Sequence, residues 1–68
     1  MDKPAYEIRI HDGWTLVENF VTADHSVAYE KLNEYAEDRA NENCTISLFE
    51  WFEGNRTEME SVYVRPGN

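Results

Sequence analysis

Alternating apolar and charged side chains predict a half-buried β-strand near the start of the chain. Residues 6–10 read Tyr-Glu-Ile-Arg-Ile, which places Tyr6, Ile8 and Ile10 on one face of a strand. A second β-rich run covers residues 14–21. Because turn-forming residues separate the two runs, we expect them to form a hairpin.

Two registers are open for this hairpin, and they differ in which side chains share a face. A two-residue Asp-Gly loop sets Ile10 opposite Thr15, whereas a three-residue loop sets Ile10 opposite Trp14. The second register matches apolar with apolar side chains. It also places Gly13 at the left-handed position that such loops need, so we favour it.

Apolar residues at helical spacing follow the hairpin. Asp24 is the favoured N-cap, with Thr22 as the competing cap, because a side-chain oxygen there accepts from the first free N–H groups of a helix. The spacing predicts a helix from about His25 to about Glu42. Its inner face is formed by Ala28, Leu32, Tyr35 and Ala36, then Arg39 or Ala40.

Two more β-rich runs complete the chain. Residues 45–53 form the first, and residues 56–64 return as the last strand after a Gly54-Asn55 turn. The order strand, strand, helix, strand, strand predicts one α+β domain spanning residues 1–68. We expect a four-stranded, mostly antiparallel sheet with one helix packed on one face.

One helix covers only one face of such a sheet, so the other face is predicted to be open. A register that sets Ile46 opposite Val64 and Leu48 opposite Val62 forms the covered face. Four large residues, here called the apolar-face residues, then point to the open side: Phe49, Trp51, Met59 and Tyr63. Exposed aromatic patches mark interfaces, and symmetric dimers are the commonest oligomers, so these residues predict a homodimer or another protein contact.

Charge adds a second candidate surface. The chain has 14 acidic and 6 basic residues, for a formal net charge of -8 on 68 residues. Five acidic residues fall at helical spacing and are here called the acidic ridge: Glu30, Glu34, Glu37, Asp38 and Glu42. Carboxylates on successive helical turns lie ~5–6 Å apart, an array that imitates the phosphates of a nucleic-acid strand. Such a surface repels nucleic acid and anionic membranes and favours a basic protein partner.

No catalytic or metal-binding motif is present in the sequence. The single cysteine, Cys44, excludes an intramolecular disulfide and is predicted to be a small buried hydrophobe. His11 and His25 are too isolated for a metal site, and there is no glycine-rich phosphate loop. We therefore expect no enzyme activity, no cofactor and no metal. The N-terminus lacks a secretory signal and no apolar run is long enough to span a bilayer, which predicts a reducing cytoplasm.

The layout resembles small phage-encoded proteins that block a host machine. The features that carry the resemblance are the 14–21 strand, the helix containing Ala28-Tyr29-Glu30, and the ending Val62-Tyr63-Val64-Arg65-Pro66. Anti-CRISPR proteins, anti-restriction DNA mimics and short inhibitors of host RNA polymerase belong to this group. The resemblance implies a stoichiometric inhibitor in the host cytoplasm, with no turnover and no cofactor.

Two functions are thus predicted. The first is a small acidic binding protein that inhibits or occupies a basic, nucleic-acid-binding protein surface through the acidic ridge, with the apolar-face residues as anchors. The alternative is an assembly module that homodimerises through the open sheet face, with the acidity serving solubility.

Overall fold

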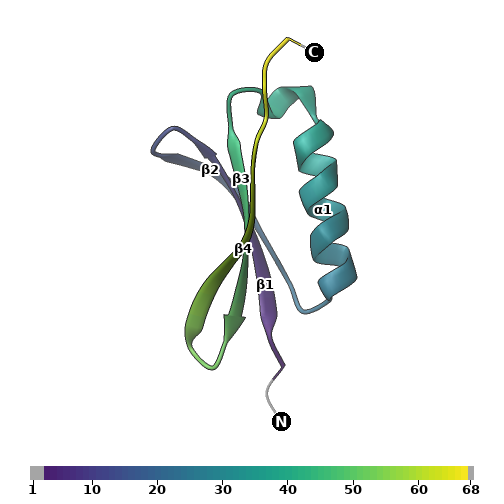
Figure 1. Ribbon diagram of the computed structural model, residues 1–68, viewed down its shortest axis with the longest axis vertical. Helices are drawn as coiled ribbons and strands as arrows, with labels where there is room; N and C mark the ends of the chain where they lie inside the picture. Colours follow the sequence, from purple (N-terminus) through teal and green to yellow (C-terminus); the bar gives the residue numbers. More distant parts are fainter. Residues whose placement is uncertain (1–2, 68) are drawn as a thin grey trace.

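The computed structural model describes residues 3–67 and confirms the predicted fold class and element order (Figure 1). Four strands and one α-helix follow one another in the order β-β-α-β-β, with a short 3-10 helix, η1, after α1. Their bounds are β1 Ala5–Asp12, β2 Thr15–Thr22, α1 His25–Glu37, η1 Arg39–Asn41, β3 Thr45–Phe52 and β4 Asn55–Tyr63. All three strand pairings are antiparallel, and the order across the sheet is β2-β1-β3-β4.

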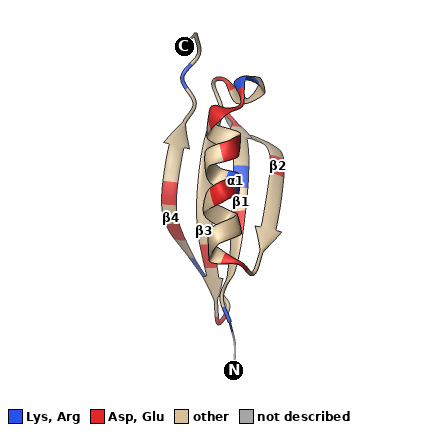
Figure 2. Ribbon diagram, turned by 90° about the vertical axis from the view of Figure 1, so that its right-hand side faces the viewer, with Lys and Arg blue, Asp and Glu red and all other residues tan. Residues whose placement is uncertain are grey.

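The core lies between α1 and the two central strands. Ile8 and Ile10 of β1 and Ile46 and Leu48 of β3 are almost completely buried on the face that α1 covers. Leu32 and Ala28 fill the helix side of this core, as the helical spacing predicts. In Figure 2, α1 lies over β1 and β3, which leaves β2 and β4 at the two sides of the sheet.

The first hairpin has neither of the predicted registers. Asp12 pairs with Thr15, so the loop consists of Gly13 and Trp14. Gly13 has φ 62° whereas Trp14 has no positive φ, which is the pattern of a type II′ turn with glycine at its first central position. A bulge between Ile10 and His11 then shifts the pairing by one residue, so that the apolar side chains of Ile8 and Phe20 lie opposite each other.

The second hairpin also differs from its predicted turn and register. Its loop is Glu53-Gly54, both with positive φ as a type I′ turn requires, in place of the predicted Gly54-Asn55. Ile46 therefore faces Val62, not Val64, and Leu48 faces Glu60, not Val62. Up to Leu48 the shift is two residues, so Val62 stays on its predicted covered face because the side-chain period of a strand is two. From Phe49 onward a bulge makes the shift three residues, so Glu58 and Arg56 lie on the face away from α1.

The helix is shorter than predicted and ends at Glu37. Asp38 turns extended (φ -81°, ψ 122°), and its carboxylate accepts a hydrogen bond from the Ala40 amide at 2.9 Å to begin η1. The Asn41 side chain donates to the Tyr35 carbonyl at 2.9 Å and so satisfies one of the last carbonyls of α1. Arg39 and Ala40, predicted as inner-face positions, are exposed. Further acidic side chains at the negative end of a helix dipole are unfavourable, which agrees with the early stop.

The predicted start of the helix at His25, with Asp24 as its N-cap, is confirmed. The Asp24 carboxylate accepts from the Ser26 and Val27 amides at 2.8 and 3.2 Å, which makes Asp24 the N-cap. Thr22, the competing cap, instead accepts from the Asp24 amide through its hydroxyl at 3.1 Å. The two residues thus act in succession to turn the chain from β2 into α1.

Candidate binding surfaces

The acidic ridge is not one helical stripe. Glu30, Glu34 and Glu37 lie on α1 at spacings of four and three residues, and all three are exposed. Their span is about 10 Å at the α-helical rise, shorter than the full ridge would cover on one continuous helix. Figure 2 shows acidic positions along α1 and on β4. The three helical carboxylates form the continuous part of the ridge.

The other two ridge residues have local structural roles. Asp38 caps η1, and the Glu42 carboxylate accepts from the Gly67 amide at 2.9 Å. On the helix, Lys31 donates to Glu34 at 3.3 Å, an exposed i,i+3 pair that relieves one of the negative charges. Glu30 and Glu37 are therefore the ridge carboxylates best placed to meet another molecule.

A shallow pocket of about 240 Å³ lies where α1 ends beside β4. Its lining consists of Ala36, Glu37, Asp38, Arg39, Glu42, Val62, Tyr63, Val64 and Arg65. The pocket therefore brings three ridge carboxylates next to Tyr63, one of the apolar-face residues. Two arginines share the same lining, so both signs of charge meet there.

The apolar-face residues differ in their exposure. Trp51, Met59 and Tyr63 are 36%, 37% and 53% exposed, but Phe49 is only 8% exposed. The predicted exposure of Phe49 is therefore wrong. Met59 lies at a bulge between Glu58 and Glu60, where β4 has one residue more than β3.

Two arginines account for the burial of Phe49. The Arg56 guanidinium lies 4.5 Å and the Arg9 guanidinium 5.5 Å from the centre of the Phe49 ring. Arg56 also lies 5.9 Å from the ring centre of Trp51. Guanidinium groups are attracted to aromatic faces and are more weakly hydrated than ammonium groups, so they cover the ring without a second helix.

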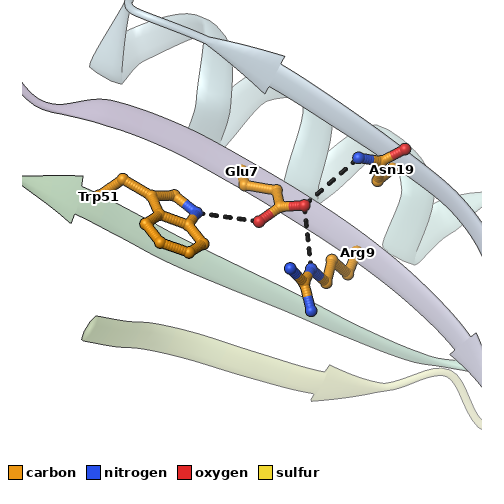
Figure 3. A network of polar contacts seen from close by, with 4 residues as sticks. All are labelled: Glu7, Arg9, Asn19 and Trp51. Carbon is orange, nitrogen blue, oxygen red and sulfur yellow. Dashed lines mark hydrogen bonds and ion pairs between the residues drawn. The ribbon is translucent and has the colours of Figure 1, made fainter. Parts of the chain in front are cut away.

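Beside this ring, a buried carboxylate holds three side chains together (Figure 3). Glu7 is 6% exposed although α1 lies on the other side of the sheet. Its Oε1 accepts from Trp51 Nε1 at 2.9 Å, and its Oε2 accepts from Arg9 Nε at 2.9 Å and from Asn19 Nδ2 at 3.3 Å. The contacts join β1, β2 and β3, so this network fixes three strands and the Trp51 ring in one arrangement.

The Glu7 network also sets the ionisation of its carboxyl group. Burial alone would raise the pKa of Glu7, but hydrogen bonds from Arg9, Trp51 and Asn19 and the charge of Arg9 outweigh it. The pKa therefore lies below its ordinary value of 4.5. Because the charged form is the one that is hydrogen-bonded, Glu7 is an anion at neutral pH despite its burial.

Sequence reasoning missed Glu7 as a site residue. The alternation Tyr-Glu-Ile-Arg-Ile does put Glu7 and Arg9 on one side of β1, which is a signal for an ion pair. Trp51 and Asn19, however, join it only through the registers of β1 with β3 and β2. The β1–β2 register depends on one turn and one bulge, and β1 and β3 are separated by β2 and α1, so neither register follows from local sequence alone.

The remaining candidate chemistry is sparse. Cys44 is buried, as predicted, and burial together with the Asp12 carboxylate raises the pKa of its thiol. Residues 3–67 contain no group of three or more His, Cys, Asp or Glu side chains that could hold a metal ion. Within the same residues, no helix combines the length and the apolar character needed to cross a membrane.

Comparisons of the chain with protein-family models, with curated proteins and with solved structures gave no match.

Proposed function

We propose that the protein is a small acidic binding protein that occupies a basic, nucleic-acid-binding surface of a partner protein in the cytoplasm. The observation that supports this most is the outward face of α1, where Glu30, Glu34 and Glu37 are all exposed and the last turn contains no basic residue. The negative end of the helix dipole adds to these charges at the same place. Asp38 and Glu42 continue the acidic surface beyond the helix.

The mode of action is stoichiometric binding without turnover. The exposed carboxylates repeat about once per helical turn, so they present a partner with a sparse copy of a phosphate array. Binding of this kind arises largely from long-range attraction, which speeds association and weakens as salt rises. The protein would thus compete with nucleic acid for the same basic groove.

The test is a pull-down from nuclease-treated bacterial lysate at low salt and at about 0.5 M salt, where the screening length falls well below 10 Å. The ridge variant is Glu30→Lys with Glu37→Lys, because neither side chain caps a helix. The matched control is Glu58→Lys with Glu60→Lys on β4, which changes the net charge by the same amount. Duplex DNA added to the bead-bound complex probes the competition.

We expect the wild type and the β4 control to retain nucleic-acid-binding proteins and the ridge variant to lose them. Salt and duplex DNA should each release the retained proteins. Equal loss of binding in the two variants would show that net charge, not the ridge, determines binding, and full retention by both would show that the ridge is not the binding surface. Retention that survives both salt and DNA would exclude imitation of nucleic acid.

A further inference from the structure

The sheet face opposite α1, here called the open face, is electrically neutral. By the strand registers it carries four charged residues among those that the structure describes: Glu7, Arg9, Arg56 and Glu58. Their formal charges cancel, whereas the whole chain has a charge of -8. The excess negative charge therefore lies elsewhere, and two copies repel each other least when they approach through their open faces.

The side chains of the open face are of the kinds that interfaces use. Trp51, Tyr63 and Val21 are partly exposed there, beside the two arginines that cover Phe49. Both lysines lie elsewhere, one on α1 and one before β1. Tryptophan, tyrosine and arginine are enriched among the residues that dominate binding energy, and lysine is depleted at interfaces.

The open face is also ordered before any contact forms. The Glu7 network fixes Trp51 and Arg9, and Phe49 lies between two guanidinium groups. Immobilising a flexible side chain on binding costs conformational entropy, and a surface that is already held avoids much of that cost.

The area of the face limits the strength of such a contact. The Cα positions extend 45 × 23 × 16 Å, and Figure 1, seen along the shortest axis, shows α1 beside the sheet and not in front of it. The sheet is therefore about 16 Å wide. With strands of eight or nine residues the face covers roughly 400–700 Å², so two copies would bury about 800–1,400 Å² against the ~1,000 Å² that a specific interface needs.

We propose that the open face is the interface of a weak symmetric homodimer, in which two sheets pack face to face and the α1 helices lie on the outside. Arg56 and Glu58 project from the same face of β4, so a two-fold axis between them can pair Arg56 of each copy with Glu58 of the other. The occupant is a second copy, because the face is neutral and carries its own complementary charges. This proposal does not depend on the one for the acidic ridge.

The test is sedimentation velocity of the wild type from about 5 μM to 1 mM, a range chosen for the modest interface area. The open-face variant is Ser61→Glu on the edge strand β4, which places a charge opposite Ser47. The matched control is Asn33→Glu on the exposed side of α1, which gives the same net charge. Val21→Glu, on the opposite edge strand, is a second open-face variant, and urea unfolding confirms that each variant is folded.

A dimer that forms with rising concentration, is weakened at least tenfold by Ser61→Glu and Val21→Glu, and is unchanged by Asn33→Glu would support the proposal. A wild type that is monomeric at 1 mM would overturn it and leave the face to a different partner. Equal weakening by all three variants would overturn it as well, because general charge repulsion would then explain the result.

Fluorescence provides a readout at the face itself. The chain has two tryptophans, and Trp14 at the first hairpin tip is 102% exposed. In a Trp14→Phe background, Trp51 is the only tryptophan left, and its emission is expected to shift to the blue over the same concentration range. No shift while dimers form would place the interface elsewhere and overturn the proposal.

Discussion

Replacing Glu7 with glutamine tests how much the buried carboxylate contributes to stability. Glutamine has nearly the same size but lacks the charge. One of its side-chain polar groups is an NH₂ group, which cannot accept the hydrogen bonds that Arg9, Asn19 and Trp51 donate to Glu7. Hydrogen bonds to a charged group contribute about 1.5–3 kcal/mol each when buried. The Arg9 and Trp51 side chains are roughly one-third exposed and glutamine can still accept from one of the donors, so we expect a net loss of about 2 kcal/mol.

Urea unfolding at about 5 μM, followed by circular dichroism, measures this loss in the monomer. For a domain of this size, 2 kcal/mol corresponds to a fall in Tm of about 8–16 °C. Glu60→Gln on β4 is the matched control, because Glu60 is exposed and has no side-chain hydrogen bond within residues 3–67. The control is expected to stay within about 0.5 kcal/mol of the wild type.

The effect of Glu7→Gln should also depend on pH. Because the folded-state pKa of Glu7 is lowered below its ordinary value of 4.5, the ionised carboxylate stabilises the fold fully above that value. This contribution is lost as the pH falls through the folded-state pKa. The stability difference between wild type and Glu7→Gln is therefore expected to be constant near pH 7 and to shrink below pH 4.5. A difference that is absent at pH 7, or that persists undiminished at pH 3, would refute the reasoning.

Three further measurements test other parts of the structure. Asp24→Ala should lower the free energy of unfolding by about 1 kcal/mol, because the first amides of α1 lose their acceptor; an unchanged urea midpoint would contradict the cap. Gly54→Ala should cost about 1–2 kcal/mol in the same assay, since φ is 81° and no atom obstructs a Cβ, so only backbone strain acts. Cys44 should react slowly with iodoacetamide in the folded protein and quickly in urea, because burial raises its pKa; rapid native labelling would contradict this.

The sequence predicted the parts of the fold that depend on periodicity. The alternation of residues 6–10 correctly gave the buried face of β1, and the spacing of Ala28 and Leu32 gave the inner side of α1. Asp24 was identified as the cap because its chemistry is local. Each of these features depends on residues close together in the chain, so local spacing and side-chain chemistry are enough to predict it.

The turns and the helix end were less predictable because several local solutions compete there. Gly13 and Gly54 both signalled turns, but one residue more or less in a loop changes the register, and the bulges in β1–β2 and β3–β4 partly cancel such shifts. The helix end depended on whether Asp38 continued α1 or capped η1.

The open face was predictable in direction but not in detail. Strand parity placed Phe49 and Trp51 on it correctly. The burial of Phe49, however, arises from two arginines, one on β1 and one on β4, that lie 47 residues apart in sequence numbering. Contacts of that range follow from the registers, and the registers were the weakest part of the sequence prediction.

The central pairing of β1 with β3 has a consequence for folding kinetics. Each hairpin and the helix join residues close in sequence, whereas Ala5 pairs with Trp51 across most of the chain. Closing that loop costs entropy before any of its contacts forms, so the two hairpins are expected to form first and the β1–β3 docking to limit the folding rate. Since the Trp51–Glu7 hydrogen bond forms only at docking, Trp51 fluorescence in refolding should report the last and slowest step.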